Sequence, residues 1–327
     1  MRALICGVNG QDGSYLAQWL IAKGYEVWGT SRDAQTSSRA NLKALGIERQ
    51  IKLISMAPSD FRSVFNAFEY SEPDEIYYLC AQSSVGLSFE QPAETLDSSV
   101  MGILNVLEVM RLRKKKAIRL YNASSSECFG DTGATPANTE TPFRPRSPYA
   151  VAKASAHWLV ANYREAYGLY ACNGILFNHE SPLRPKRFVT QKIVHAARRI
   201  AQGSEERLTL GRLDISRDWG WAPEYVVLMH LMLQQDKPDD FVIATGQSNR
   251  LKDFVEAAFG YFNLDWNAHV ETSPSLYRPD EITYSAGDPS ATFATLGWQA
   301  KYRMFDVVTM MCEATTSHGG ALIFSEH

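Results

Sequence analysis

The chain has 327 residues, of which 45% are hydrophobic and 21% are charged, and its formal net charge is −3. This length allows one large or two moderate domains with ample core, and the composition is that of a globular protein. The weakly acidic balance excludes the basic surface of a nucleic-acid-binding protein.

Short apolar runs alternate with amphipathic stretches through the first half of the chain. Strands are predicted at 2–7, 25–30, 73–81, 117–126 and 170–178. A further strand ends near 55–60, and helices are predicted at 13–24, 60–70, 93–113 and 147–168. This alternation is typical of βαβ units, which build a parallel sheet covered by helices on both faces. Crossover rules then favour a doubly wound sheet, whose ligands bind at the carboxyl ends of the strands.

The pattern changes after Asn178, where segments rich in Pro, Arg and Gly follow at 178–188 and 211–225. Helices are predicted at about 188–203, 224–235, 251–262 and 304–315, with shorter strands between them. We therefore predict that residues 1–178 form the sheet domain, to which later segments return. Residues 179–327 then form mainly a smaller, discontinuous domain, with a tail at 317–327 that is expected to be loose.

The five cysteines form no C-x-x-C pair, and their number is odd. This favours reduced thiols in the cytosol over a disulfide framework or a zinc site, and we expect no metal. The N-terminal sequence MRALICGVNGQDG leads straight into a strand without a signal peptide, and no apolar run is long enough to span a membrane. We therefore expect a cytoplasmic protein that contacts neither membrane nor nucleic acid.

A glycine-rich loop joins the first predicted strand to the first predicted helix, with the spacing G-x-x-G-x-x-G over 7–13. Gly7 permits the tight turn, Gly10 lets the backbone approach a pyrophosphate at the helix N-terminus, and Gly13 lets the helix lie close to the strand. The alternative is an ordinary glycine-rich turn, which the strand before and the helix after the loop disfavour. The loop therefore predicts a dinucleotide site.

The end of the second predicted strand bears on the choice between NAD and NADP. An acidic residue there would bind the ribose hydroxyls of NAD, but here Arg32 follows the strand. The planar guanidinium of Arg32 suits a 2′-phosphate and favours NADP, unless Arg32 is a solvated loop residue. Asp33, the next residue, works against NADP because its carboxylate would repel that phosphate.

Tyr149 and Lys153 form a Y-x-x-x-K motif at the start of a predicted helix, with Ser147 as a plausible N-cap and Pro148 in the first turn. The i, i+4 spacing puts the phenol and the ammonium on one helix face. A lysine beside a tyrosine lowers the phenol pKa from about 10, which gives a base for a hydroxyl proton near neutral pH. The alternative is a surface Tyr/Lys pair, which the glycine loop and the SSSE sequence at 124–127 disfavour.

Several segments together carry a family resemblance. They include GVNGQDGSYLA, AQSSVGLSFEQP, SSSECFG, PRSPYAVAK, GILFNHESPLR, FVTQKI and RDWGWAPEYV. With them the chain resembles the GDP-mannose 4,6-dehydratase family of extended short-chain dehydrogenases/reductases, from residue 1 to about 315. The resemblance implies an α/β fold: a Rossmann-type doubly wound parallel sheet with a smaller C-terminal α/β substrate domain. It also implies NADP as cofactor and a homodimer or homotetramer.

The implied activity is that of a lyase, which turns GDP-D-mannose into GDP-4-keto-6-deoxy-D-mannose and water. Tyr149 takes the O4 proton while C4 gives a hydride to NADP⁺, Ser125 bonds O4, and Lys153 tunes Tyr149. Glu127 removes the acidified C5 proton and helps the C6 hydroxyl to leave as water, after which the hydride returns to C6. Glu127 could otherwise be a turn or salt-bridge carboxylate, but elimination needs a carboxylate next to C5.

The family match assigns further residues to the two ligands. The implied cofactor-binding residues are Gly7, Asn9, Gly10, Gln11, Asp12, Gly13, Arg32, Leu79, Ala81, Gln82, Ser83, Tyr149, Lys153, His179 and Arg184. The implied substrate-binding residues are Ser84, Val85, Asn178, Val189, Lys192, Arg217, Arg278 and Glu281. Arg217 and Arg278 suit a diphosphate, and Glu281 could accept from the N1–H and N2–H groups of guanine. Outside its motif, His179 would be interpreted as a structural histidine with satisfied hydrogen bonds.

Two positions depart from the family pattern. The family often has two adjacent arginines after the second strand, in a loop that reaches a neighbouring subunit's cofactor, but here Asp33 follows Arg32. The choice of NADP over NAD and of tetramer over dimer both depend on this loop. The third strand ends at Ala57 and Pro58, where an Asp commonly meets the adenine. Adenine contacts are therefore expected from the backbone or from elsewhere, for example Asp60.

Other functions stay open from the sequence. The same chemistry on another GDP-sugar, such as a heptose or an N-acetylhexosamine, would use the same reacting residues and differ in the pocket near 84–87. A nucleotide-sugar epimerase or 4-reductase usually lacks the acid at Glu127. A non-catalytic cofactor-sensing protein would not need the complete set of Ser125, Glu127, Tyr149 and Lys153.

Overall fold

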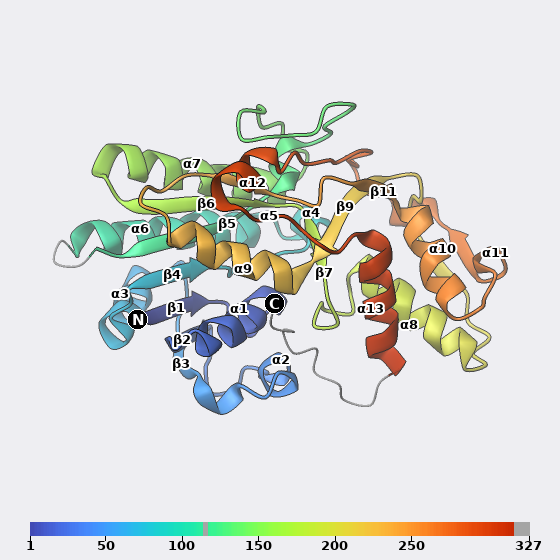
Figure 1. Cartoon of the computed structure of the whole chain (residues 1–327), viewed down its shortest axis with the longest axis horizontal. Coiled ribbons are helices and arrows are strands. Elements are labelled where there is room, and N and C mark those ends of the chain that lie inside the picture. The colour runs from blue at the N-terminus through green and yellow to red at the C-terminus, as the bar shows by residue number, and fades with distance from the viewer. Residues whose placement is uncertain (114–116, 317–327) are drawn as a thin grey trace.

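A seven-stranded sheet is the frame of the molecule. The computed structural model describes residues 1–113 and 117–316. The strands of this sheet are β1 (Arg2–Cys6), β2 (Glu26–Ser31), β3 (Lys52–Ser55), β4 (Glu75–Tyr78), β5 (Arg119–Ser125), β6 (Tyr170–Leu176) and β10 (Phe241–Ile243). They are all parallel and lie in the order β10-β6-β5-β4-β1-β2-β3 (Figure 1). The predicted doubly wound parallel sheet is confirmed.

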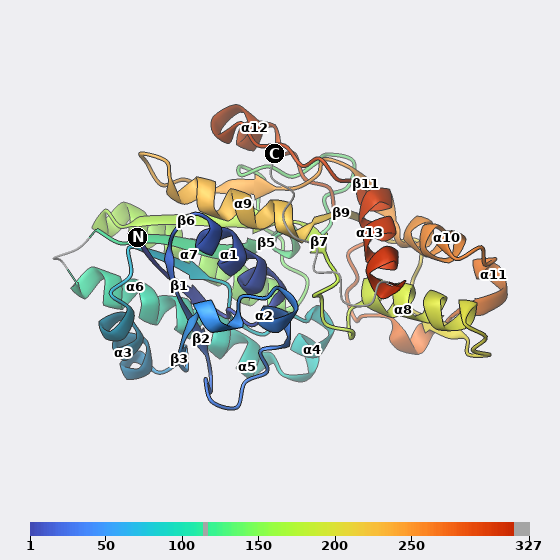
Figure 2. The same cartoon turned by 60° about the horizontal axis from the view of Figure 1, so that its bottom comes forward.

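Two separate cores cover the two faces of this sheet, because successive side chains of a strand point to opposite faces. On β1, Ile5 belongs to one core and its neighbour Leu4 to the other. The core around Ile5 is closed by helices α1 (Gln11–Ala22) and α9 (Ala222–Leu233). The core around Leu4 is closed by helices α3 (Phe61–Ser71), α6 (Gly102–Leu112) and α7 (Pro148–Tyr167). Figure 2 shows the two helical layers on either side of the sheet.

A second, smaller unit lies at one end of the central sheet (Figure 1). Its strands form a three-stranded sheet of β7 (Asn178–Glu180), β9 (Ser216–Trp221) and β11 (Ser248–Arg250), and a pair of β8 (Leu208–Leu210) and β12 (Val270–Thr272). Its helices are α8 (Val189–Ala201), α10 (Leu251–Tyr261), α11 (Trp266–His269) and α13 (Met304–Thr316). Ile193, Trp219 and Phe254 lie in its hydrophobic core. The helices predicted near 188–203, 251–262 and 304–315 are thereby confirmed.

The chain returns to the central sheet after β9. Helix α9, predicted at 224–235, packs beside α1, and β10 then pairs with β6 at the sheet edge. Helix α12 (Ser290–Leu296) packs on β10, where the Thr292 hydroxyl donates to the Val242 carbonyl at 2.6 Å. A domain boundary near residue 178 stays a prediction, and the tail expected to be loose lies outside the described residues. No helix among the described residues is both long and apolar enough to cross a membrane.

The single helix predicted over 93–113 is interrupted in the structure. Helix α5 (Pro92–Leu96) leads into a π-helical turn over Asp97–Met101, and α6 begins only at Gly102. The buried Tyr78 hydroxyl donates to the Ser98 carbonyl at 3.0 Å, and a Cβ on Gly102 would lie 1.9 Å from that hydroxyl oxygen. A side chain that occupies a helix carbonyl in this way displaces the regular bonding of the turn.

Candidate active site

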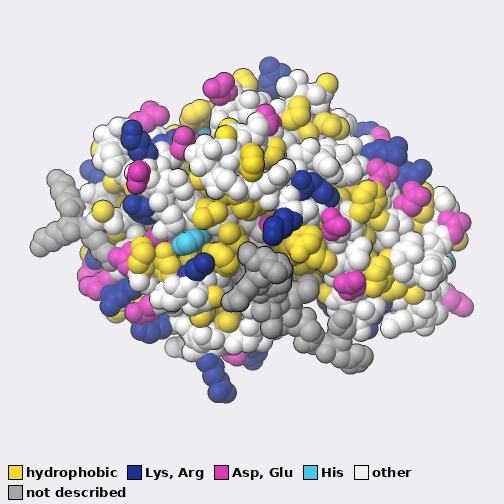
Figure 3. Space-filling view, in the orientation of Figure 1, with side chains coloured by type: hydrophobic (Ala, Val, Ile, Leu, Met, Phe, Trp, Pro, Cys, Tyr) yellow, Lys and Arg dark blue, Asp and Glu magenta, His cyan; other side chains and the backbone are white. Residues whose placement is uncertain are grey.

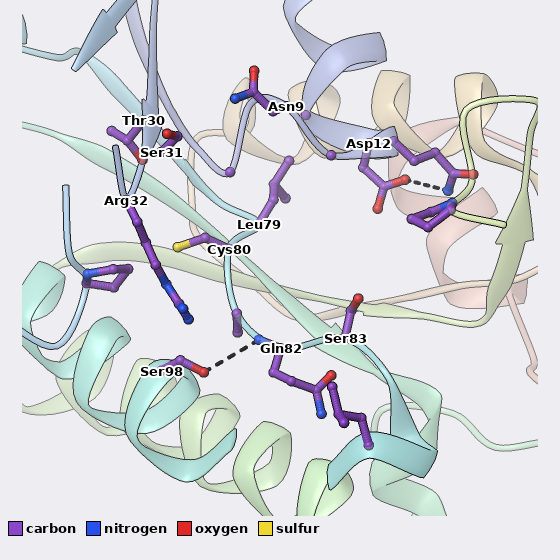
Figure 4. A pocket seen from close by; sticks show the side chains of 18 of the residues that line it. Asn9, Asp12, Thr30, Ser31, Arg32, Leu79, Cys80, Gln82, Ser83 and Ser98 are labelled. Atoms are coloured by element: carbon purple, nitrogen blue, oxygen red, sulfur yellow. Dashed lines mark hydrogen bonds between the residues drawn. The ribbon is translucent and has the colours of Figure 1, made fainter. Parts of the chain in front are cut away.

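Two joined cavities lie at the carboxyl ends of the central strands. The first, of about 580 Å³, runs past the ends of β1, β2 and β4, and Figure 4 shows it from close by. The second, of about 440 Å³, lies between the end of β5 and the second unit. Both are lined by Asp12, Leu79, Ser83, Arg184, Arg187 and Phe188. Ligands in the two cavities can therefore meet.

The glycine loop borders the first cavity. Gly7 has φ +88°, a conformation that side chains other than glycine rarely adopt. A Cβ on Gly13 would lie 2.4 Å from the Gly7 carbonyl oxygen, so only glycine lets α1 start this close to β1. Gly10 is the N-cap of α1, and no side chain caps this helix end. The N–H groups of the first turn can therefore bind a diphosphate, and the loop fits a dinucleotide.

Three polar residues of the same loop line the cavity: Asn9, Gln11 and Asp12. Gln11 and Asp12 are hydrogen-bonded to other parts of the protein. The Gln11 side-chain amide donates to Asp12 Oδ1 at 2.9 Å and to the His179 carbonyl at 3.2 Å, and it accepts from the Ser181 hydroxyl at 2.8 Å. Gln11 thus fixes the start of α1 against β7 and the residue that follows it. By contrast, Asn9 Oδ1 is buried and has no hydrogen-bond partner among the described residues, so it can accept from a ligand.

His179 joins β7 to the glycine loop as a charged side chain. Its Nδ1 lies 2.7 Å from the Phe177 carbonyl oxygen, its Nε2 lies 3.0 Å from Asp12 Oδ2, and its ring stacks on Tyr225 with centroids 4.8 Å apart. Because both nitrogens face acceptors, both must carry a proton. Burial lowers the pKa of His179, but the Asp12 charge and hydrogen bond outweigh it and the pKa is raised. Burial likewise opposes the charge of Asp12, yet His179 brings the pKa of that carboxyl down to about 2.

The Asp12–His179 pair predicts a pH-dependent stability. A raised His179 pKa means that its contribution is complete below about pH 6.5 and is lost as pH rises through the raised value, whereas the Asp12 contribution is lost only as pH falls toward 2. Asp12→Asn should therefore cost about 1–2 kcal/mol near pH 6 and remove most of the alkaline loss of stability. Urea unfolding across pH would measure both effects.

The matched control for this experiment is Asp236→Asn, at an exposed carboxylate outside both cavities. This control should keep the wild-type profile. If Asp12→Asn also kept the wild-type alkaline slope, His179 would not be the titrating group.

Arg32 lies at the far end of the first cavity. Its side chain extends from the end of β2 toward the helical segment that carries Ser98 (Figure 4). Arg32 Nη2 lies 2.5 Å from Glu94 Oε1, and Glu94 also lines the cavity. The predicted residues after β4 form the adjoining wall: Leu79, Ala81, Gln82 and Ser83.

Asp33 and Asp60 do not line either cavity, contrary to the roles expected for them. Asp33 accepts from the backbone N–H and hydroxyl groups of Thr36 at 3.2 and 2.7 Å, so its carboxylate is held in its own loop. Asp60 caps α3 by accepting from the Arg62 N–H at 2.9 Å. Pro58 does line the cavity, as does Met56, so the segment after the third strand offers the cavity apolar side chains.

Ser125 and Glu127 enter the second cavity from the carboxyl end of β5. Ser125 is the last residue of this strand and caps a 3₁₀ helix over Ser126–Phe129, where the Glu127 N–H donates to the Ser125 hydroxyl at 3.3 Å. This tight turn places both side chains in the wall of one cavity, which Tyr149 and Lys153 also line. All four predicted reacting groups are thus brought together.

Helix α7 begins as predicted and presents Tyr149 and Lys153 to this cavity. Ser147 is its N-cap and accepts from the Ala150 N–H at 3.1 Å, and Pro148 is its first residue. The two residues are four positions apart and lie on one helix face. Lys153 Nζ is 5.9 Å from the centroid of the Tyr149 ring.

The expectation that Lys153 lowers the Tyr149 pKa is wrong for this structure. Burial raises the pKa of Tyr149 well above 10, and the Glu127 charge adds to this, while a hydrogen bond with the Ser125 hydroxyl lowers it only in part. Lys153 Nζ instead donates to the Ala123 carbonyl at 2.8 Å, and burial lowers its own pKa. Tyr149 therefore stands as a phenol in the same cavity wall as Ser125.

The second unit supplies the far wall of the second cavity. All the predicted substrate residues line it: Ser84, Val85, Asn178, Val189, Lys192, Arg217, Arg278 and Glu281. Arg217 and Arg278 both donate to Glu281 Oε1, at 3.1 and 3.3 Å. Burial lowers the pKa of Arg217, and the charges of Glu127 and Glu281 oppose this. Two cations around one carboxylate leave a net positive charge, which suits an anionic ligand.

Some residues of the site were not predicted. Glu94 and Ser98 reach the first cavity from α5 and the π-helical turn, and no sequence signal marks them. Arg187 and Phe188 stand where the two cavities join, and the Arg184 guanidinium lies 3.9 Å from the Phe188 ring centroid. The basic segment PLRPKRF could have indicated this contact.

Comparison with known proteins adds to this geometry. A family model described as GDP-mannose 4,6 dehydratase matches residues 4–311. The chain belongs to the GDP-mannose 4,6-dehydratase family. GDP-mannose 4,6 dehydratase 1 of Arabidopsis thaliana is 46% identical over 320 residues, which cover 95% of this chain and 88% of that protein. GDP-mannose 4,6-dehydratase of Vibrio cholerae is 42% identical over 330 residues, covering 91% of this chain and 89% of that protein.

Solved structures agree on the fold. A dTDP-glucose 4,6-dehydratase from Streptomyces venezuelae, crystallised as a double mutant with NAD bound, superposes with a TM-score of 0.84 at 19% identity. The match covers 97% of this chain and 98% of that one. At this identity the likeness concerns the arrangement of strands and helices alone, and the site of this GDP-mannose 4,6-dehydratase family member is argued from its own residues.

Proposed function

We propose that the chain is a GDP-mannose 4,6-dehydratase, a hydro-lyase that converts GDP-D-mannose into GDP-4-keto-6-deoxy-D-mannose and water. The observation that carries this proposal is the meeting of Ser125, Glu127, Tyr149 and Lys153 in the wall of one cavity, next to a cleft that fits a dinucleotide. The named function of the relatives supports the same substrate.

We assign NADP to the first cavity. The uncapped N-terminus of α1 and Gly10 would hold the pyrophosphate, and Arg32 would hold the 2′-phosphate. Bound there, the cofactor would supply reversible hydride transfer, so that turnover would need no external oxidant. Arg184 lines this cavity, and His179 would act on it through the Asp12 carboxylate, to which its ring is hydrogen-bonded.

The residues of the second cavity would move the protons. Ser125 would hydrogen-bond the sugar O4, and Tyr149, which lines the same cavity, would accept the O4 proton as the C4 ketone forms. Lys153, held on the Ala123 carbonyl, would bond the nicotinamide ribose. Glu127 would then remove the C5 proton, whose acidity the ketone raises, and would pass it to the C6 hydroxyl, which leaves as water. When the hydride returns to C6, C5 would take up a proton again, which balances the O4 proton that Tyr149 accepted and releases.

The wall from the second unit would hold the nucleotide half of the substrate. Arg217 and Arg278 are cationic forks that can pair with a diphosphate, and Lys192 adds a third positive charge. Glu281 holds both arginines in place through Oε1 and is our candidate for the acceptor of the guanine N–H groups.

We further propose that the enzyme works in the cytosol as a homodimer or homotetramer. The cysteines in the described part of the chain are all free thiols, as a reducing compartment requires. Leu112, Val151 and Trp158 are exposed apolar residues on α6 and α7, which supports a subunit interface there. Sedimentation of the purified protein as a monomer would contradict the oligomer.

The direct test incubates the purified protein with GDP-mannose and NADP⁺ and follows the sugar nucleotide by mass spectrometry. We expect loss of one water with no net formation of NADPH, because the hydride is returned within each turnover. A parallel incubation with dTDP-glucose should give no product, since Glu281 and its surroundings are assigned to guanine. Intact GDP-mannose in the presence of bound cofactor would overturn the proposed activity.

A further inference from the structure

The far end of the first cavity contains an ion pair that is not part of the reacting set. Arg32 follows β2, Glu94 lies on α5, and they are 62 positions apart in the sequence. Arg32 Nη2 and Glu94 Oε1 are 2.5 Å apart, and both residues line the cavity. Their side chains are 72% and 38% exposed, so the pair is accessible to a ligand that enters the cavity.

One of the two carboxylate oxygens of Glu94 accepts no hydrogen bond within the described part of the chain. This oxygen, Oε2, is buried. An unpartnered carboxylate oxygen is costly to keep in a folded protein unless a donor arrives to use it. Thr30, Ser31 and Ser98 complete this end of the cavity with small hydroxyl side chains, none of which carries charge.

We propose that Glu94 sets the cofactor selectivity of this enzyme, by competing with a 2′-phosphate for Arg32 and by accepting from the 2′-hydroxyl of an unphosphorylated ribose. The inference rests on the proposed function only in that the first cavity binds a nicotinamide dinucleotide. An acidic residue that binds the ribose hydroxyls is usually sought at the end of the second strand. Here Glu94 would take that role from helix α5.

The two cofactors meet the pair differently. A 2′-phosphate gains Arg32 only by sharing it with Glu94, and its two negative charges then lie close to a carboxylate. A ribose hydroxyl can donate to the exposed part of the Glu94 carboxylate and leaves the ion pair intact. An exposed ion pair is weak, so Arg32 can still change partners and NADP is not excluded. The preference for NADP over NAD is therefore smaller with the Arg32–Glu94 pair than it would be with Arg32 alone.

The variant Glu94→Gln keeps the size of the side chain and removes its charge. We expect it to tighten NADP⁺ binding about tenfold and to leave NAD⁺ binding the same or a few times weaker. Arg32→Ala should act in the opposite direction and lose most of the preference for NADP⁺. Dissociation constants for both cofactors, measured by titration calorimetry without any sugar nucleotide, give the ratio directly.

Glu90→Gln is the matched control, because Glu90 is exposed, lies four positions earlier and lines neither cavity. It should keep the wild-type ratio. An unchanged ratio in a folded Glu94→Gln variant would overturn the role of Glu94, while dehydration of GDP-mannose would still support the proposed function. A wild-type protein that bound neither cofactor would overturn both.

Discussion

Glu127→Gln is expected to stop the loss of water while sparing the oxidation at C4. Turnover should fall about a thousandfold, the size of effect typical of a lost general base. The turn that carries residue 127 should persist, because the Ser125 cap bonds to its backbone N–H rather than to its side chain. Ser125, Tyr149 and Lys153 stay in place, so we expect reduced cofactor to accumulate and its near-ultraviolet absorbance to rise.

Two further observables separate Glu127 as a base from Glu127 as a structural carboxylate. In heavy water the wild type should place one deuterium at C5, and the Gln variant should place none. Because the Glu127 charge helps to raise the pKa of Tyr149, the variant should also show C4 oxidation at lower pH than the wild type. Glu140→Gln, at an exposed loop position outside both cavities, should match the wild type in every assay. Full dehydratase activity in Glu127→Gln would remove this residue from the mechanism.

The part of the site that sequence could predict is the part set by local structure. Alternating apolar runs indicated the central strands, so the residues after β1 and β5 were expected at one edge of the sheet. The cap at Ser147 and the proline after it predicted the start of α7, which places Tyr149 and Lys153 on one helix face. These signals depend on residues within a few positions of one another.

What sequence could not predict depends on distant partners. The charge of His179 follows from Asp12, 167 positions away, and the opposition of Glu94 to Arg32 joins residues 62 positions apart. The i, i+4 spacing of Tyr149 and Lys153 predicted their proximity correctly. It could not show that the Lys153 ammonium bonds to the Ala123 carbonyl while burial raises the Tyr149 pKa.

That raised pKa gives the second large prediction, for Tyr149→Phe. The substitution removes only the phenol oxygen, so packing and cofactor binding should persist while the proton of O4 has no acceptor. We expect the first hydride transfer to slow about a thousandfold, with no rise in reduced cofactor in a single turnover. Tyr167→Phe is the matched control, since Tyr167 is an exposed residue near the end of the same helix.

The pH dependence of the first step tests the same assignment from another side. A base must be deprotonated to act, and burial holds the pKa of Tyr149 above its ordinary value, so the wild-type rate of C4 oxidation should rise with pH through the neutral range. The residual rate of Tyr149→Phe should lack this rise.

The Tyr149 and Glu127 variants together separate the first step of the reaction from the later ones. Both substitutions should abolish product, but only Glu127→Gln should trap reduced cofactor. Cofactor reduction at the wild-type rate in Tyr149→Phe would show that another group takes the O4 proton, and Glu127 would then be the first to test, because it lines the same cavity.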